Sequence, residues 1–271
     1  MVQAAPLVAY PNVESQIEAL KRDGYVYFPG VLDATEISEL RAAIDRLEAR
    51  QESFDRDGSE NGCAEKHIKC VFNRDAHFLQ FIDRPGVSEV AEAVLTHQAG
   101  RRPIECHIIG MTAWVTGPGR PDQDLHVDWM PFPLPEDVAG DPRVQVPVMI
   151  ATAHYYLDDL HEELGPTKFI PGSHRAGRPP DGATEWNGQG EQSLLCNAGD
   201  VVMFRSEVWH RGTANNSRQS RYLLQAHYAN RMISQKFPPY LNRFQFDPDI
   251  LSRATPRQRR MLGEHAKAAY D

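Results

Sequence analysis

The segment from residue 105 to residue 227 is the part of the chain that most constrains its fold. Short apolar and aromatic runs alternate there with turn signals such as Gly117-Pro118-Gly119 and Gly165-Pro166. Several short strands separated by such turns are typical of a β-sandwich or a β-barrel. The sequence predicts strands at 107–115, 146–157, 167–170, 201–204 and 222–228.

Helical patterns precede this segment. Apolar residues recur at helical spacing over 13–22, and a four-residue strand is expected at 25–28. Asp33 can cap a second helix because Glu36 follows three residues later, and a third helix is expected at 87–97.

The chain after the Pro238-Pro239 pair is expected to be helical again, and Thr255-Pro256 can open a basic amphipathic segment. No repeat or long linker divides the sequence. We therefore expect one mainly β domain over 1–271, with a β core at about 105–230 and helices flanking it on both sides.

Composition excludes several classes of protein. The chain has 29 Lys and Arg against 37 Asp and Glu, a net charge of −8, whereas nonspecific nucleic-acid binding needs a basic surface. It has no run of about 18 apolar residues and no basic start typical of a secretion signal. We expect a cytoplasmic monomer or homodimer with free, partly buried cysteines and a small-molecule partner, without nucleic acid or membrane.

The pair His126-x-Asp128 offers two metal ligands that share a face if the segment is extended. About one such pair is expected by chance in a chain of this composition, so the pair gains weight only from its context. His210 follows a predicted strand and could complete a face of two histidines and one carboxylate on iron, which leaves three positions open. Arg221 begins the next predicted strand and could bind the far carboxylate of a chelating cosubstrate.

These residues, together with two turn motifs, resemble the phytanoyl-CoA dioxygenase family of iron(II)/2-oxoglutarate oxygenases. The motifs are 165–174, with the sequence GPTKFIPGSH, and Ala198-Gly199-Asp200. The resemblance covers roughly residues 15 to 235. It implies a double-stranded β-helix, also called a jelly roll, as in the cupins.

The resemblance also implies a reaction. Iron(II) would be held by His126, Asp128 and His210, with 2-oxoglutarate and O2 as cosubstrates and Arg221 as the cosubstrate anchor. A small molecule, most plausibly one of specialised metabolism, would be hydroxylated while 2-oxoglutarate is decarboxylated to succinate. Related halogenases lack the carboxylate ligand, so Asp128 argues against halogenation.

Five residues are weaker candidates for the site. Thr213 could help to bind 2-oxoglutarate, or it could be a turn hydroxyl that hydrogen-bonds its own backbone. Lys69 is either a second cation that faces the cosubstrate or substrate, or a surface lysine. Trp129, Met130 and Phe132 directly follow the ligand pair and either line the substrate pocket or belong to the core.

Other conspicuous residues are expected to be structural. The segment 171–174 predicts a turn in which His174 bonds locally. His107, His154 and His227 lie on predicted strands and could face the barrel interior, but we expect them to be hydrogen-bonded core residues. A group of basic residues late in the chain is expected on a solvated helix face: Arg253, Arg257, Arg259 and Arg260.

Two other functions remain open at this stage. A cupin-like metal hydrolase or isomerase could use the same ligands for zinc, but it would give Arg221 no role. A noncatalytic barrel that binds a small ligand is the third hypothesis. The substrate itself cannot be deduced, and the charge of −8 disfavours a polyanion.

Overall fold

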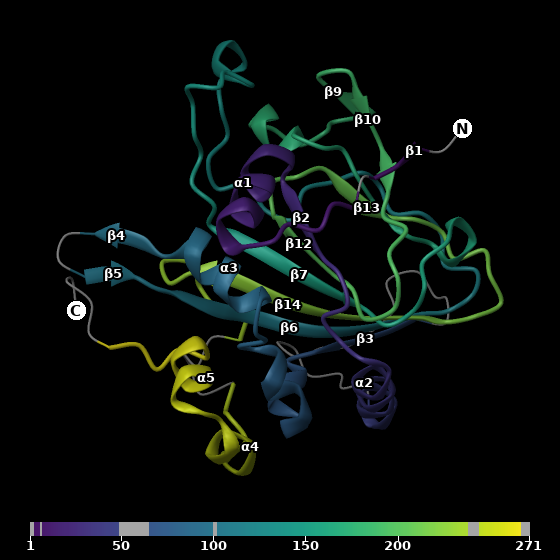
Figure 1. The fold of residues 1–271 in the computed structure, drawn as a ribbon, viewed down its shortest axis with the longest axis vertical. Coiled ribbons are helices and arrows are strands. Elements are labelled where there is room, and N and C mark those ends of the chain that lie inside the picture. The colour runs from purple at the N-terminus through teal and green to yellow at the C-terminus, as the bar shows by residue number, and fades with distance from the viewer. Residues whose placement is uncertain (1–2, 6, 49–64, 100–101, 238–243, 267–271) are drawn as a thin grey trace.

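A large antiparallel sheet forms the centre of the molecule (Figure 1). The structure is a computed structural model that describes residues 3–5, 7–48, 65–99, 102–237 and 244–266. In spatial order, the sheet consists of β2 (Tyr25–Phe28), β12 (Val201–Arg205), β7 (Ile150–Tyr156), β14 (Arg221–Asn230), β6 (Cys106–Thr116) and β3 (Glu65–Lys69). The strands that follow one another in space come from distant parts of the sequence, as a jelly roll requires.

A smaller sheet faces the large one. Its strands, in spatial order, are β1 (Gln3–Ala4), β11 (Gln192–Ser193), β8 (Thr167–Phe169) and β13 (His210–Gly212). Two short hairpins add β4 (His97–Ala99) with β5 (Arg102–Ile104), and β9 (Glu185–Trp186) with β10 (Gln189–Gly190). The fold class is the predicted one: mainly β, with two opposed sheets of a jelly roll and helices around them.

The helices are α1 (Val13–Asp23), α2 (Ala34–Arg46), α3 (Val87–Leu95), α4 (Pro248–Arg253) and α5 (Pro256–Met261). Figure 1 shows α2, α4 and α5 on one side of the large sheet, and β9, β10 and β13 on the other. The predicted capping box of α2 is confirmed, because Asp33 accepts from the Glu36 amide and Glu36 accepts from the Asp33 amide.

Both faces of the large sheet are covered, and alternate residues of each strand divide between them. On β14, Leu224, Ala226 and Tyr228 pack in the main hydrophobic core with the helices. Leu223, in contrast, packs in a second apolar cluster that also contains Phe169 of the small sheet. The even positions of β14 therefore build the core, and its odd positions face the space between the two sheets.

The Ala198-Gly199-Asp200 motif has a structural role that explains two of its residues. Asp200 accepts hydrogen bonds from the Tyr27 hydroxyl at 2.7 Å and the Gly30 amide at 2.8 Å, and so ties the strand β2 to the turn before β12. Gly199 has φ +91°, and a Cβ there would stand 2.4 Å from the Leu32 carbonyl oxygen. Only glycine fits this combination of backbone conformation and close approach.

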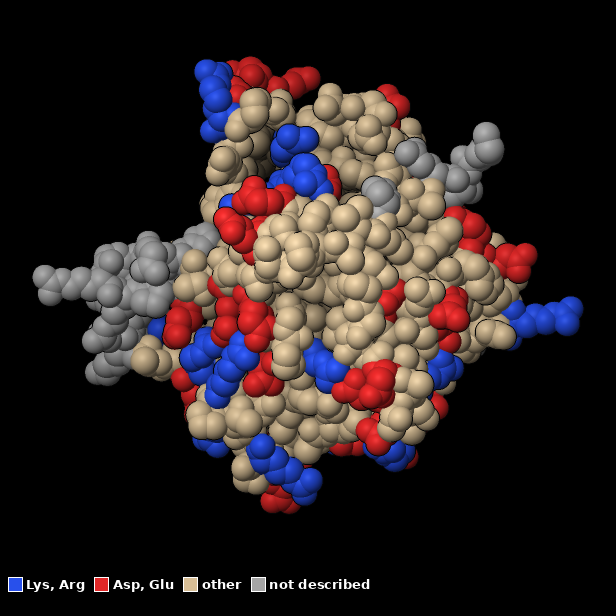
Figure 2. All heavy atoms as spheres, in the orientation of Figure 1, with Lys and Arg blue, Asp and Glu red and all other residues tan. Residues whose placement is uncertain are grey.

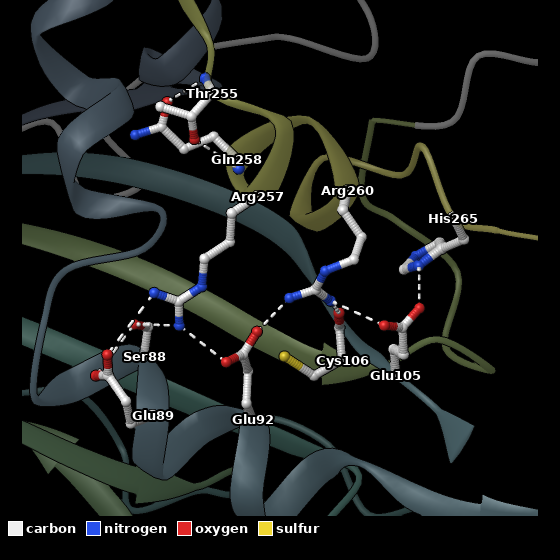
Figure 3. Close-up of polar contacts among 10 residues, drawn as sticks. All are labelled: Ser88, Glu89, Glu92, Glu105, Cys106, Thr255, Arg257, Gln258, Arg260 and His265. Atoms are coloured by element: carbon white, nitrogen blue, oxygen red, sulfur yellow. Dashed lines mark hydrogen bonds and ion pairs between the residues drawn. The ribbon is translucent and has the colours of Figure 1, made fainter. Parts of the chain in front are cut away.

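The late basic cluster differs from its prediction. Arg257 and Arg260 of α5 both pair with Glu92 of α3, and Arg260 also reaches Glu105 (Figure 3). Instead of facing solvent, these two guanidinium groups join the last helix to α3 and to the residue before β6. The prediction was wrong for them because their acidic partners are about 165 residues away in the sequence, beyond any local pattern.

The surface shows no large patch of one charge on the face that Figure 2 draws, and the described cysteines are buried. On the face shown in Figure 2, acidic and basic side chains are interspersed. No helix within the described ranges is long and apolar enough to cross a bilayer. Cys106 and Cys196 are free and buried, Cys70 is buried, and Cys63 lies outside the described residues.

Candidate metal centre and active-site cavity

The three predicted ligands lie together at one end of the space between the sheets. Asp128 Oδ1 is 3.6 Å from His210 Nε2 and 4.0 Å from His126 Nε2. One nitrogen or oxygen from each residue lies within 4.8 Å of the others, which is the spread that a single metal ion can bridge. His210 is buried, whereas about 40% of the side-chain surface of Asp128 remains exposed, so the group has a closed and an open side.

Backbone pairing fixes the relative positions of these ligands. His126 and His210 form an isolated antiparallel bridge, with N···O distances of 3.0 and 2.9 Å. The Asp128 amide donates to the Ser206 carbonyl at 3.0 Å. The amide of Trp209, which directly precedes His210, donates a hydrogen bond to Ser173 Oγ at 2.8 Å, so the 171–174 turn holds the backbone next to this candidate ligand. His174 of that turn bonds the Lys21 carbonyl, which is distant in sequence rather than local, and stays away from the three ligands.

The hydrogen bonds of His126 and His210 occupy Nδ1 of each ring and leave Nε2, the nitrogen nearer Asp128, available to bind a metal. His126 Nδ1 lies 2.7 Å from the Asp124 carbonyl oxygen, and His210 Nδ1 lies 2.9 Å from that of Val208. A carbonyl oxygen only accepts, so each Nδ1 carries the proton and each Nε2 keeps its lone pair. Burial lowers the pKa of His210, which favours the neutral form that ligates a metal, and Asp128 opposes this shift. Two neutral imidazoles and a carboxylate fit iron(II).

Arg221 is a buried cation, and two of its three guanidinium nitrogens lack an acceptor among the described residues. It begins β14, and its Nε and Nη1 are buried without a hydrogen-bond partner among the described residues. Burial lowers its pKa, and the nearby Tyr156 opposes that shift. A buried guanidinium without acceptors is costly, whereas a carboxylate binds it with two parallel hydrogen bonds. The residue therefore fits a dianionic cosubstrate such as 2-oxoglutarate.

One cavity of about 400 Å³ joins Arg221 to the three ligands. Its walls come from β3, β6, β14, β7 and β12 of the large sheet and from β8 and β13 of the small sheet. Many ionisable side chains line this cavity. They include Lys69, Arg120, His126, Asp128, His154, His210, Arg221, His227 and Lys236. The cavity thus brings together the three predicted ligands, the predicted anchor and one of the weaker candidates.

The other weaker candidates lie elsewhere. Thr213 does not line the cavity, and its hydroxyl donates at 2.6 Å to the carbonyl of Pro166, which is 47 residues away, rather than to the backbone of its own turn. Trp129 lines an adjoining cavity and is 40% exposed. Phe132 is 43% exposed, and neither it nor Met130 lines these two cavities.

Sequence reasoning missed residues that face the cavity. His154 and His227 were expected in the core, but both line the cavity, where His154 contacts Gln225 and His227 contacts Thr152. The signal was present, because residues 221, 223, 225 and 227 alternate onto one face of a strand. Lys236 also lines the cavity. It lies outside every predicted strand, so no periodicity could reveal it.

Comparison with known proteins gives consistent matches. Residues 20–223 match the family described as phytanoyl-CoA dioxygenase (PhyH). Dioxygenase cdmA of Talaromyces verruculosus is 26% identical over 274 residues, which cover 94% of this chain and 84% of that protein. Dioxygenase ALT11 of Alternaria alternata is 25% identical, with 90% and 79% covered. The structure of the epimerase SnoN with Fe3+, alpha ketoglutarate and nogalamycin RO has a TM-score of 0.61 and 24% identity, covering 80% of this chain and 83% of that one.

Proposed function

Because the chain belongs to the phytanoyl-CoA dioxygenase family and is an iron- and 2-oxoglutarate-dependent dioxygenase, we propose that His126, Asp128 and His210 hold its iron(II). Arg221 binds the far carboxylate of 2-oxoglutarate. The observation that carries the second assignment is the pair of buried guanidinium nitrogens without an acceptor, in the same cavity as the three ligands. A zinc hydrolase on the same ligands would leave that cation uncompensated.

The protein's own residues bind and orient the reactants. When bound, iron and 2-oxoglutarate supply the oxidation, in which the cosubstrate gives succinate and carbon dioxide and a substrate carbon is hydroxylated with O2. His126 and His210 keep fixed orientations through their Nδ1 hydrogen bonds. Arg221 holds one end of the cosubstrate at the closed side, so the open side beside Asp128 is left for the substrate.

We propose that the substrate is a small molecule of secondary metabolism, and the structure of the epimerase SnoN with nogalamycin RO supports this class. Hydroxylation is the reaction we propose, because the complete ligand triad supports the common outcome of this chemistry. An epimerase among the structural neighbours makes product analysis part of the test.

The experiment is anaerobic addition of iron(II) and 2-oxoglutarate to the purified protein, followed by exposure to O2. We expect a weak visible charge-transfer band before O2 and succinate after it. A substrate screen read by succinate release then identifies the class of molecule oxidised. A protein that binds zinc, forms no band and releases no succinate would contradict the proposal and favour the hydrolase hypothesis.

A further inference from the structure

A second cavity adjoins the first at the metal carboxylate. It measures about 530 Å³ and shares Asp128, His227 and Lys236 with the first. Its other walls are mainly apolar, from Ile109, Ile150, Ile233, Trp129 and Met232. Met232 is 71% exposed and Trp129 is 40% exposed, so large apolar side chains stand open at this cavity. An apolar molecule placed here would lie next to the candidate metal centre.

Lys236 stands where the two cavities meet. Its amide donates to the Ile109 carbonyl at 2.8 Å, which fixes its backbone against β6. Its aliphatic chain passes Gly110 closely, because a Cβ on that glycine would lie 3.4 Å from Lys236 Cδ. Lys236 is an exposed residue, and it lines both cavities, so its side chain is accessible from them. No hydrogen bond or ion pair of its Nζ occurs within the part of the chain that the structure describes.

The charges around the first cavity favour an additional anion. Among its described lining residues, Lys69, Arg120, Arg221 and Lys236 are basic, whereas Glu65 and Asp128 are acidic. Iron(II) and 2-oxoglutarate cancel one another in charge, so binding both leaves the excess of two positive side chains unchanged. In a chain with a net charge of −8, such a concentration of cations at one site is unexpected. Desolvation lowers the pKa of Lys236, the nearby Asp128 opposes this shift, and a further anion beside the ammonium group would also favour its charged form.

We propose that Lys236 binds a carboxylate of the substrate, whose apolar body lies in the second cavity against Trp129 and Met232. The substrate is then a hydrophobic organic acid rather than a neutral scaffold. This inference rests on the proposed function, since it assigns Arg221 to 2-oxoglutarate and leaves Lys236 for the substrate. The carboxylate and the carbon to be oxidised belong to one molecule, so Lys236 also fixes which carbon lies beside the triad.

The test uses two probes of the same shape, 2-naphthoate and 2-naphthamide, which differ in charge. Each is titrated by calorimetry into the anaerobic protein loaded with iron(II) and 2-oxoglutarate. We expect the acid to bind roughly 10- to 100-fold more tightly than the amide, as a charge-assisted hydrogen bond allows. Lys236→Gln should abolish that preference, Lys236→Arg should keep most of it, and Lys168→Gln, a lysine that lines neither cavity, should leave it unchanged.

Each outcome decides the inference. Equal binding of acid and amide to the unaltered protein, no binding of either probe at millimolar concentration, or an acid preference that survives in Lys236→Gln would overturn it. An affinity for 2-oxoglutarate that falls in Lys236→Gln would instead assign this lysine to the cosubstrate and also overturn it. The charge-transfer band separates the two proposals, because its absence refutes the proposed function, whereas an intact band without acid preference refutes only the role of Lys236.

Discussion

Replacing Arg221 by methionine should change two properties in opposite directions. The variant should lose affinity for 2-oxoglutarate, because two charge-assisted hydrogen bonds disappear. Each such bond contributes about 1.5–3 kcal/mol, so the loss is about 3–6 kcal/mol, or roughly 100- to 10,000-fold in dissociation constant. The cosubstrate-free protein, in contrast, should become more stable, because it no longer buries a cation whose Nε and Nη1 find no acceptor among the residues that the structure describes.

The size of the stability gain follows from the same two atoms. Each unsatisfied buried donor costs about 1–3 kcal/mol, and part of that gain is offset by the packing of the lost guanidinium. We expect the free energy of unfolding of the metal-free protein to rise by about 1–3 kcal/mol. Urea denaturation without metal or cosubstrate measures it, and anaerobic titration of the charge-transfer band measures the dissociation constant.

Two further variants make the comparison specific. Arg218→Met removes an exposed arginine from the turn before the same strand and should change both quantities little. Arg221→Lys keeps the charge but not the planar pair of donors, so its affinity should be intermediate. The reasoning fails if Arg221→Met binds 2-oxoglutarate as well as the unaltered protein. It also fails if the metal-free variant loses several kcal/mol, because the guanidinium would then be a structural group with its own partners.

Three other substitutions test the metal centre and the fold. Asp137 is exposed, so Asp137→Ala serves as the control for Asp128→Ala. In a metal analysis, purified Asp128→Ala should contain less than about a tenth of the iron found in the control. Equal iron contents would show that Asp128 is not a ligand. Burial lowers the pKa of His174 to about 3, so only the unfolded chain takes up its proton below about pH 6.5. The free energy of unfolding should therefore fall as the pH decreases from 6.5 towards 3, by at most about 1.4 kcal/mol per pH unit from this residue. Denaturation of His174→Gln at several pH values should show a flatter profile, and an unchanged slope would contradict the assignment. Gly199→Ala should lower the free energy of unfolding by at least about 2 kcal/mol more than Gly182→Ala in the same assay. Both glycines have positive φ, but only at Gly199 would the new Cβ lie 2.4 Å from a carbonyl oxygen. Equal losses in the two variants would show that the structure relaxes around this contact.

The strands and helices were largely predictable because their signals are local. The run 201–204 became β12 with one more residue, and the strand expected at 146–157 begins instead at Ile150. Pro147 explains part of that difference, since proline has no amide to donate to a ladder. The spatial order of the strands could not be read from the sequence. It depends on pairings such as β2 with β12, which lie more than 170 residues apart.

Some residues of the site could likewise be predicted from local sequence patterns, whereas others could not. His126 and Asp128 are two residues apart, and His210 and Arg221 are eleven apart, so a spacing pattern could find them. Lys236 reaches the cavity only because β6 accepts a hydrogen bond from its backbone. Its neighbours in the sequence carry no regular pattern that marks it, so its place in the site depends on tertiary structure alone.

The isolated bridge between His126 and His210 has a consequence for the order in which the protein opens. The stretch 117–149, which carries two of the three candidate ligands, is described throughout and contains one 3-10 turn (Glu136–Val138) but no strand. A metal held by Asp128 and His210 would act there as a reversible cross-link that closes a loop of roughly 80 residues. By loop entropy alone, such a closure is worth on the order of 4 kcal/mol. Removal of the metal by a chelator should therefore leave the large sheet folded, while the backbone amides of residues 117–149 exchange with solvent much faster. The metal would thus also stabilise the segment that forms one side of its own site.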